Sequence, residues 1–318
     1  EFRRVLFRSK FNAYFTDRIA ELHATGHIGN SQTYKQTQDM LRSYDRKLDQ
    51  RLFSDIDLRY VRGFDMFLQK RSCCGNTRKF YFKALRAILN RANAEGVGSV
   101  ATYPFGRGGF EVSKLEEATA KRYLPAAELS KLKSATANNP QCEYARKLFL
   151  FSYYCYGISF IDMAMLTAAH IKQMEDGDYI VYKRQKIKRQ KGVKPISIKI
   201  TPAIRQLIES LQAASPTVDD FLLPVVTRSG YTGERLYMHI RTRYSKYQKY
   251  LRLLAEELGI DFHLTSYVSR HTAAMTLQRN HIPREVISQM LGHADLETTN
   301  VYLDSFDNGV INEAAKVL

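Results

Sequence analysis

Three residues near the end of the chain, Arg270, His293 and Tyr302, carry side chains suited to chemistry on a phosphodiester. Breaking that bond without a metal ion needs a nucleophile, a group that exchanges a proton with it, and fixed positive charge beside the nonbridging oxygens. The phenolic oxygen of Tyr302 can attack phosphorus, and the resulting phosphotyrosine would keep the bond energy for rejoining. The guanidinium of Arg270 can grip a phosphate bidentately. His293 can donate a hydrogen bond or exchange a proton with the tyrosine.

Helical patterns and turn residues predict how these side chains are held. Arg270 falls within a helix, Pro283 stands at the start of the next one, and Gly292 ends that helix just before His293. At this position His293 is also consistent with a histidine that only pairs with the helix dipole. We expect the adjacent His271 in the core or behind the site, because successive side chains on a helix point about 100° apart.

The pattern R-H-T, then L-G-H, then T-x-x-x-Y, with 32 positions from Arg270 to Tyr302, resembles the C-terminal signature of the tyrosine recombinases, the phage and transposon integrase family. The resemblance implies a catalytic domain that cleaves and rejoins DNA through a 3′-phosphotyrosyl intermediate, with no metal, ATP or other cofactor. Ser159 stands where the family's first arginine is usual, as it does in some integrases of conjugative transposons, and Arg184 or Arg189 are candidate replacements. Tyr267, three residues before Arg270, stands where a histidine is frequent and can donate a hydrogen bond.

A basic hairpin is predicted between residues 179 and 205, which include nine basic and no acidic side chains. Two short β-rich runs, 179–184 and 195–200, flank its loop. In the resembled family a hairpin lysine protonates the departing 5′ oxygen, and the resemblance gives this role to Lys186, with Lys188 and Lys191 as alternatives. If none of them is an acid, the hairpin would still bind DNA. The residues expected to contact DNA here are Lys183, Arg184, Lys188 and Arg189.

Residues 10–95 show helical periodicity only, with helices predicted over 11–23, 34–44, 58–71 and 77–94. Asp57 and Asn76 stand where N-caps are expected. Residues 66–94 contain seven basic and no acidic side chains, which indicates a face that follows DNA phosphates or, alternatively, a solvated helix surface. The predicted DNA contacts on this face are Arg71, Arg78, Lys79, Lys83 and Arg86.

The amino-acid composition indicates a folded chain that binds a polyanion. Its 318 residues carry 48 basic and 32 acidic side chains, a formal charge of +16. The longest apolar run, 148–161, contains Ser and Gly, so no membrane contact is expected. The four cysteines show no zinc spacing. We expect a mainly α fold with a small antiparallel sheet (α+β). It would comprise a fragment edge or cloning scar (1–9), a helical SAM-like core-binding domain (10–105), a linker (106–124) and the catalytic domain (125–318).

The sequence therefore predicts a site-specific DNA recombinase or integrase of a bacterial mobile element, acting in the cytoplasm at the nucleoid. Four cleavages per recombination predict a homotetramer on two double-stranded sites, and a monomer or weak oligomer without DNA. The apolar residues of 304–318 predict a short amphipathic helix that docks on a neighbouring subunit or packs on its own. The alternatives are a type IB topoisomerase with the same chemistry and a noncatalytic DNA-binding protein derived from a recombinase.

Overall fold

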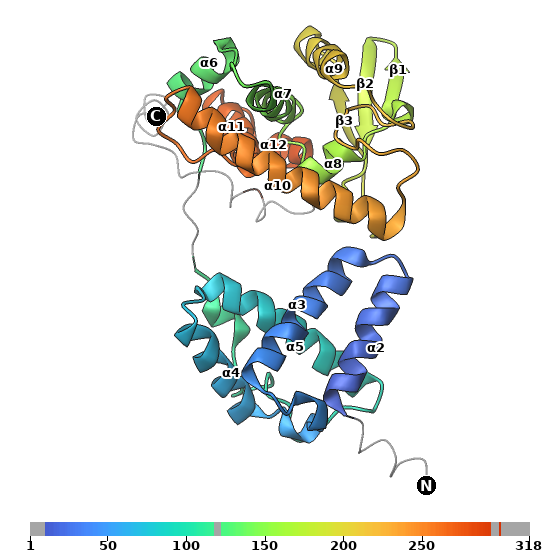
Figure 1. The fold of residues 1–318 in the computed structure, drawn as a ribbon, viewed down its shortest axis with the longest axis vertical. Helices are drawn as coiled ribbons and strands as arrows, with labels where there is room; N and C mark the ends of the chain where they lie inside the picture. Colours follow the sequence, from blue (N-terminus) through green and yellow to red (C-terminus); the bar gives the residue numbers. More distant parts are fainter. Residues whose placement is uncertain (1–9, 118–121, 294–298, 300–318) are drawn as a thin grey trace, which may run out of the picture. The chain divides into compact units, whose positions relative to one another are not determined.

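The computed structural model describes residues 10–117, 122–293 and 299. By its internal contacts the chain divides after Thr119 into two compact units, which are described one at a time (Figure 1). In the described residues the first unit is helical, and the second joins helices to a three-stranded antiparallel sheet. The predicted mainly α fold with a small antiparallel sheet is confirmed.

The first unit packs its helices around aromatic side chains. Phe11, Phe15, Phe64 and Phe82 are fully buried, and the rings of Phe64 and Phe82 meet edge to face with centroids 5.5 Å apart. Its helices are α2 (Phe11–Ala24), α3 (Ile28–Tyr44), α4 (Leu58–Lys70) and α5 (Gly75–Ala94), joined or followed by the 3-10 turns η1 (Leu48–Gln50), η2 (Phe53–Asp55) and η3 (Val112–Leu115).

The helices of this unit begin partly at the predicted residues and partly elsewhere. Asp57 caps α4 as expected, accepting a hydrogen bond from the Tyr60 amide at 2.8 Å. Helix α3 starts at Ile28, six residues before the predicted start. The predicted cap Asn76 was wrong: it lies inside α5, and its side-chain amide donates to the Glu117 carbonyl at 2.7 Å. The first turn of α5 is instead satisfied from far along the chain.

Residues that follow α5 remain attached to the first unit. Phe105 and Phe110 pack against its core, and Val112 is 2% exposed. Glu117 accepts a hydrogen bond from the Gly75 amide at 2.8 Å. The sequence assigned 106–124 to a linker, and the structure differs in that part of this stretch is packed. Apolar residues dispersed among glycines lack periodicity but can still fill a core.

The second unit centres on α7 (Pro140–Tyr154), whose residues Leu148, Phe149 and Phe151 are almost wholly buried. Pro140 occupies its first turn, and Asn139 caps it. The other helices are α6 (Ala126–Ser134), α8 (Phe160–Ala164), α9 (Pro202–Ala214), α10 (Gly233–Glu257), α11 (Ser266–Arg279) and α12 (Arg284–Leu291), with the 3-10 turn η4 (Ala168–His170).

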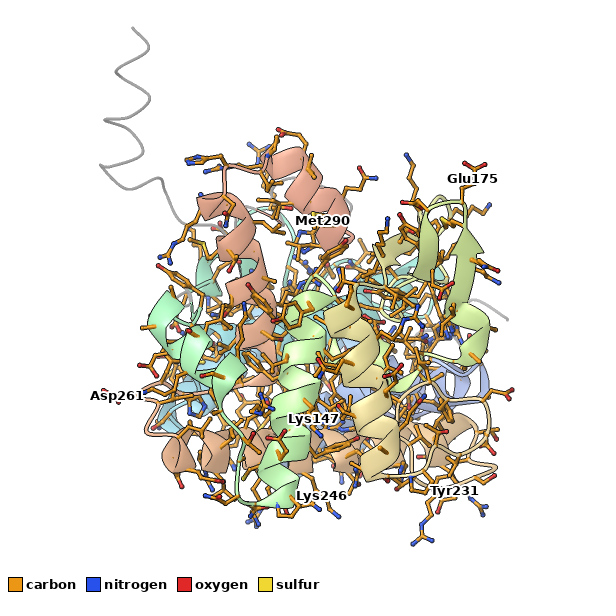
Figure 2. All side chains as sticks on the ribbon, turned by 90° about the horizontal axis from the view of Figure 1, so that it is seen from above. Lys147, Glu175, Tyr231, Lys246, Asp261 and Met290 are labelled. Carbon is orange, nitrogen blue, oxygen red and sulfur yellow. The ribbon has the colours of Figure 1, made fainter. Side chains whose placement is uncertain are left out.

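The sheet has the order β1-β2-β3, with β1 (Ile171–Met174), β2 (Gly177–Tyr182) and β3 (Ile196–Lys199) antiparallel to their neighbours. The predicted hairpin is β2–β3, with Ile180 opposite Ile198 and both fully buried. Strand β1 was not predicted, because three of its four residues are exposed and its sequence, IKQM, lacks a strand pattern. The β1–β2 turn, marked by Glu175, projects from the body of the unit (Figure 2).

Candidate active site

Arg270 is fixed inside the second unit by hydrogen bonds to main-chain carbonyls. The residue is 3% exposed on α11. Its Nη1 donates to the Gly157 oxygen at 2.9 Å, and its Nη2 donates to the Leu291 oxygen at 2.6 Å. A buried guanidinium requires such acceptors. Arg270 thus joins α11, the turn before α8 and the end of α12.

The turn before α8 can approach Arg270 only because residue 157 is a glycine. Gly157 has φ +70°, in the left-handed region, and a Cβ atom there would lie 2.5 Å from the Arg270 Cα. The buried Ser152 hydroxyl of α7 donates to the Ile158 carbonyl at 2.8 Å and lies 2.8 Å from the Ser269 hydroxyl of α11. Two helices therefore hold this turn against the arginine.

His293 lies beside Arg270, as the predicted chemistry requires. The Arg270 Nη2 and His293 Nε2 are 2.9 Å apart, and His293 Nδ1 lies 2.7 Å from the Thr299 hydroxyl. Because a guanidinium nitrogen only donates, Nε2 is the acceptor and carries a lone pair. The neutral ring then holds its proton on Nδ1, which donates to Thr299. Gly292, with φ +63°, ends α12 and leaves room for Ile196 of β3.

Ser159 takes part in a small network in place of an arginine. It caps α8, and its hydroxyl donates to the Asp162 carboxylate at 2.6 Å. The other oxygen of Asp162 accepts the Gln185 amide at 2.6 Å, so the carboxylate also ties down the loop after β2. Asp162, 3% exposed, was not among the predicted site residues. The signal was present: Ser159 and Asp162 have capping-box spacing.

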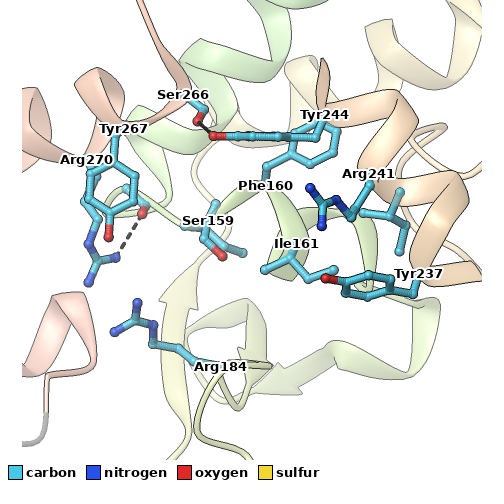
Figure 3. Close-up of a pocket in the computed structure, with 13 residues that line it drawn as sticks. Ser159, Phe160, Ile161, Arg184, Tyr237, Arg241, Tyr244, Ser266, Tyr267 and Arg270 are labelled. Carbon is cyan, nitrogen blue, oxygen red and sulfur yellow. Dashed lines mark hydrogen bonds between the residues drawn. The ribbon is translucent and has the colours of Figure 1, made fainter. Parts of the chain in front are cut away.

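Arg184, from the loop after β2, points toward Arg270 across a common space (Figure 3). Its Nη1 donates to the Gly292 carbonyl at 3.2 Å. Its buried Nε has no hydrogen-bond partner within the described parts of the chain. The Nε of Arg78 in the first unit has the same property, so it does not by itself mark a ligand site; at Arg184, however, an oxyanion in this space would satisfy the nitrogen.

A cavity of about 350 Å³ opens in front of these residues (Figure 3). It is lined by residues of α10, the start of α11, the Gly157–Ile161 turn and Arg184. Tyr267, which is 51% exposed, stands at its edge, and its ring lies 5.8 Å from that of His271. Arg270, Arg184, Ser159 and Tyr267 therefore meet at one cavity, although they come from three separate segments, the first and last of which lie more than a hundred residues apart.

The hairpin lysines lie in the long loop between β2 and β3. Lys183, Lys186, Lys188 and Arg189 are exposed. A second cavity, lined by the loop and α12, includes Arg184, Lys191 and His293, whereas Lys186 is not among the residues that line either of these two cavities. The loop thus offers Lys191 at the His293 cavity and Lys186 at the open surface.

One tyrosine close to the site, Tyr182, is buried, unlike the exposed Tyr267. Tyr182, at the end of β2, is 5% exposed, and burial, followed by the nearby Asp162, raises the pKa of its phenol. Tyr182 therefore keeps its proton and is a poor nucleophile.

The predicted DNA contacts of α4 and α5 divide into two groups. Arg71, Lys83 and Arg86 are exposed. Arg78 instead forms an ion pair with Asp65 at 2.9 Å, with both side chains mostly buried. Lys79 pairs with Glu116 at 2.5 Å, and the hydrogen bond from Lys79 lowers the pKa of that carboxyl.

Tyr302 and the segment 304–318, predicted as the nucleophile and an amphipathic helix, lie outside the described residues. None of the described helices is both long and apolar enough to span a bilayer.

Comparison with known families identifies both units. A phage integrase SAM-like domain matches residues 10–111, and the phage integrase family matches residues 122–308, more than half of the chain. The chain belongs to the phage integrase family and carries the catalytic domain of a tyrosine recombinase, the class of enzyme that the sequence predicted.

Individual relatives agree with this family. The tyrosine recombinase XerD of Halalkalibacterium halodurans is 41% identical over 54 residues, which are 17% of this chain and 18% of that protein. The Tn1549 transposon integrase, solved with a circular intermediate DNA, has 13% identity and a TM-score of 0.65, over 97% of this chain and 99% of that one. A lambda integrase dimer bound to a core site has 15% identity and a TM-score of 0.60, over 92% and 98%. These two likenesses concern the fold.

Proposed function

We propose that this protein is a site-specific DNA integrase that cleaves one strand at a time with Tyr302 and leaves the 3′ end on the tyrosine. A 5′-hydroxyl from a partner strand then attacks the phosphotyrosine, releases Tyr302 and restores a phosphodiester. The proposed partner is double-stranded DNA. In support, the Tn1549 integrase was solved with a circular intermediate DNA and the lambda integrase dimer was solved bound to a core site. We further propose that four copies act on two sites in the bacterial cytoplasm.

The observation that carries the proposal is the convergence of Arg270, His293 and Arg184. Two guanidinium groups that face one space supply fixed positive charge for a phosphorane, without reorganisation at the moment of reaction. In this proposal Arg184 does the work of the family's first arginine, whose usual position is occupied by Ser159 in this chain. Its hydrogen bond to the Gly292 carbonyl and the acceptor-free Nε support that role. Tyr267 adds a neutral hydrogen-bond donor, whereas Ser159, whose hydroxyl donates to Asp162, contributes by fixing the turn.

Proton transfer is assigned to His293 and Lys186. His293 Nε2 is the acceptor proposed for the Tyr302 phenolic proton, with Thr299 holding the ring tautomer. Because the Nε2 lone pair accepts from Arg270 Nη2 in this structure, that hydrogen bond is given up when Nε2 takes the proton. Lys186 donates a proton to the departing 5′ oxygen, with Lys188 and Lys191 as alternatives. Lys191 has in its favour that it lines one cavity with His293.

A covalent-adduct assay on a nicked suicide substrate, made from the ends of the element that encodes this protein, tests the proposal. The wild-type protein is expected to form a covalent complex with the 3′ end, and Tyr302→Phe to form none while still binding DNA. Adduct at the wild-type level in Tyr302→Phe would place the nucleophile elsewhere. Absence of adduct from the wild type, with DNA binding kept, would favour the noncatalytic alternative.

Arg184→Met provides a second arm of the same assay. Loss of one fixed transition-state donor is expected to slow cleavage about 100-fold or more. Arg189→Met, which removes the other candidate replacement from the same loop, is compared in the same assay. Because Arg189 lines neither cavity, its loss is expected to slow cleavage much less. Equal cleavage by Arg184→Met and the wild type would contradict the replacement of the missing arginine.

A further inference from the structure

The cavity in front of Arg270 extends well beyond the residues assigned to the scissile phosphate. Its far wall is made by α10, which contributes Tyr237, Ile240, Arg241 and Tyr244. Figure 3 shows the Arg241 side chain reaching from α10 toward Phe160 and Ser159, on the opposite side of the space from Arg270 and Arg184. No acidic side chain among the residues that the structure describes lines this cavity. It therefore has cationic groups at both ends.

The guanidinium of Arg241 makes no polar contact that stabilises the described part of the fold. In the described residues its guanidinium forms no hydrogen bond or ion pair, and it lies 6.0 Å from the centroid of the Tyr237 ring in a cation–π contact. Arg243, two residues later, differs, because its Nε donates to the Val225 carbonyl at 3.1 Å. A guanidinium held near a ring and left without an anion is placed to receive one.

The surface between the two ends is largely apolar and fixed. Ile161, Tyr237 and Ile240 contribute side chains to it. The Tyr244 ring contacts Phe160 at 5.3 Å, and its hydroxyl lies 3.0 Å from the Ser266 hydroxyl and accepts from Gln248 at 3.1 Å. Tyr244 is thus held through its polar end, which leaves its ring to form the wall. Apolar and aromatic surfaces of this kind suit a sugar or a base.

We propose that this cavity holds one whole nucleotide unit of the cleaved strand. The scissile phosphate lies at Arg270 and Arg184, the neighbouring phosphate lies at Arg241, and the nucleoside between them packs on Ile161 and Tyr237. A volume of about 350 Å³ is near the lower end of small-molecule sites, which fits one nucleoside rather than a longer stretch. Arg241 is then a positioning residue that sets which phosphate meets Arg270. This inference rests on the proposed function, because it takes Arg270 as a phosphate ligand.

Deoxyadenosine 3′,5′-bisphosphate carries two phosphates on one nucleoside and requires no knowledge of the target sequence. Its binding to the full chain can be compared with that of deoxyadenosine 3′-monophosphate and 5′-monophosphate by titration calorimetry or by NMR. A second charge-assisted contact is expected to make the bisphosphate bind about tenfold tighter than the better monophosphate. Arg241→Met is expected to remove this advantage and to leave the affinity for that monophosphate within about twofold of wild type.

Arg235→Met is the matched control, because Arg235 is an exposed arginine on the same helix that does not line the cavity. It should keep the advantage of the bisphosphate. Equal affinity of the wild type for all three nucleotides, or an equal loss in Arg235→Met and Arg241→Met, would overturn the proposal. Neither result depends on cleavage. Adduct formation by Tyr302 without a bisphosphate advantage would refute this inference alone, and a bisphosphate advantage without adduct would refute only the proposed cleavage.

Discussion

The two basic tracts of this protein look alike in sequence and differ in structure. Residues 66–94 and 179–205 both lack acidic side chains. In the first tract Arg78 and Lys79 are paired with Asp65 and Glu116, which come from outside the tract. The second tract also has paired cations, since Lys199 and Arg205 form ion pairs with Asp176 and Asp178. In its loop, however, Lys186, Lys188 and Lys191 form no ion pair with any described residue. A run without acids therefore predicts a positive surface only where the fold brings no carboxylate to it.

The difference assigns different tasks to the paired and the unpaired cations of the two tracts. Where a cation is paired and partly buried, its contribution to DNA binding is offset by the carboxylate beside it, and its removal mainly affects folding. Where cations are exposed and unpaired, they add to the attraction of phosphates and can take part in proton transfer. Substitutions of the paired cations should therefore fail to reproduce the effects of substitutions of the exposed, unpaired ones.

The largest expected difference concerns the leaving group. If Lys186 is the general acid, Lys186→Ala should slow cleavage of normal DNA by about 10²–10⁴-fold. It should have little effect on DNA with a 5′-bridging phosphorothiolate, because a thiolate leaves without a proton. Rates of adduct formation on the two substrates measure this.

Lys188→Ala and Lys191→Ala belong in the same experiment, and Lys83→Ala from the first tract is the control. If the phosphorothiolate substrate restores cleavage only in Lys191→Ala, the general acid is Lys191, which lines a cavity together with His293. If the sulfur substrate rescues none of the hairpin variants, the tract only binds DNA, and the two tracts differ less than proposed.

A stability measurement examines the first tract. Arg78→Met leaves the mostly buried Asp65 carboxylate without its cation, which should lower the free energy of unfolding of the first unit by about 3 kcal/mol. Urea unfolding followed by circular dichroism measures the change. Lys83→Met, at an exposed position of the same helix, should stay within about 0.5 kcal/mol of wild type. Equal stability of the two variants would mean that the Arg78–Asp65 pair contributes nothing to the fold.

The smallest expected effect is on the salt dependence of DNA binding. Each neutralised phosphate contributes about −0.9 to the slope of log affinity against log salt. The double variant Lys186→Ala/Lys188→Ala should therefore make the slope shallower by up to about 1.8. Lys79→Ala should change it by much less, because Glu116 already neutralises that lysine. Titrations by fluorescence anisotropy between low and moderate salt give the slopes. A change in Lys79→Ala as large as that in the double variant would show that DNA displaces Glu116.

The sequence by itself determined the family, the helical first unit, the β2–β3 hairpin and the chemical types in the site. These features depend on local patterns: apolar periodicity, helix punctuation around Pro283 and Gly292, and the spacing from Arg270 to Tyr302. Asp57 was recognised as a cap for the same reason, since its partner Tyr60 is three residues away.

Only the tertiary structure decided which charges are available and which residues complete the site. Asp65 and Glu117 act on α5 from other segments, and Asp162 joins Ser159 to a loop 23 residues further on. Arg241 reaches the cavity from α10, outside every motif of the sequence. The physical reason is that pairing energies depend on distance and burial, and the fold sets both by bringing together side chains far apart in the chain.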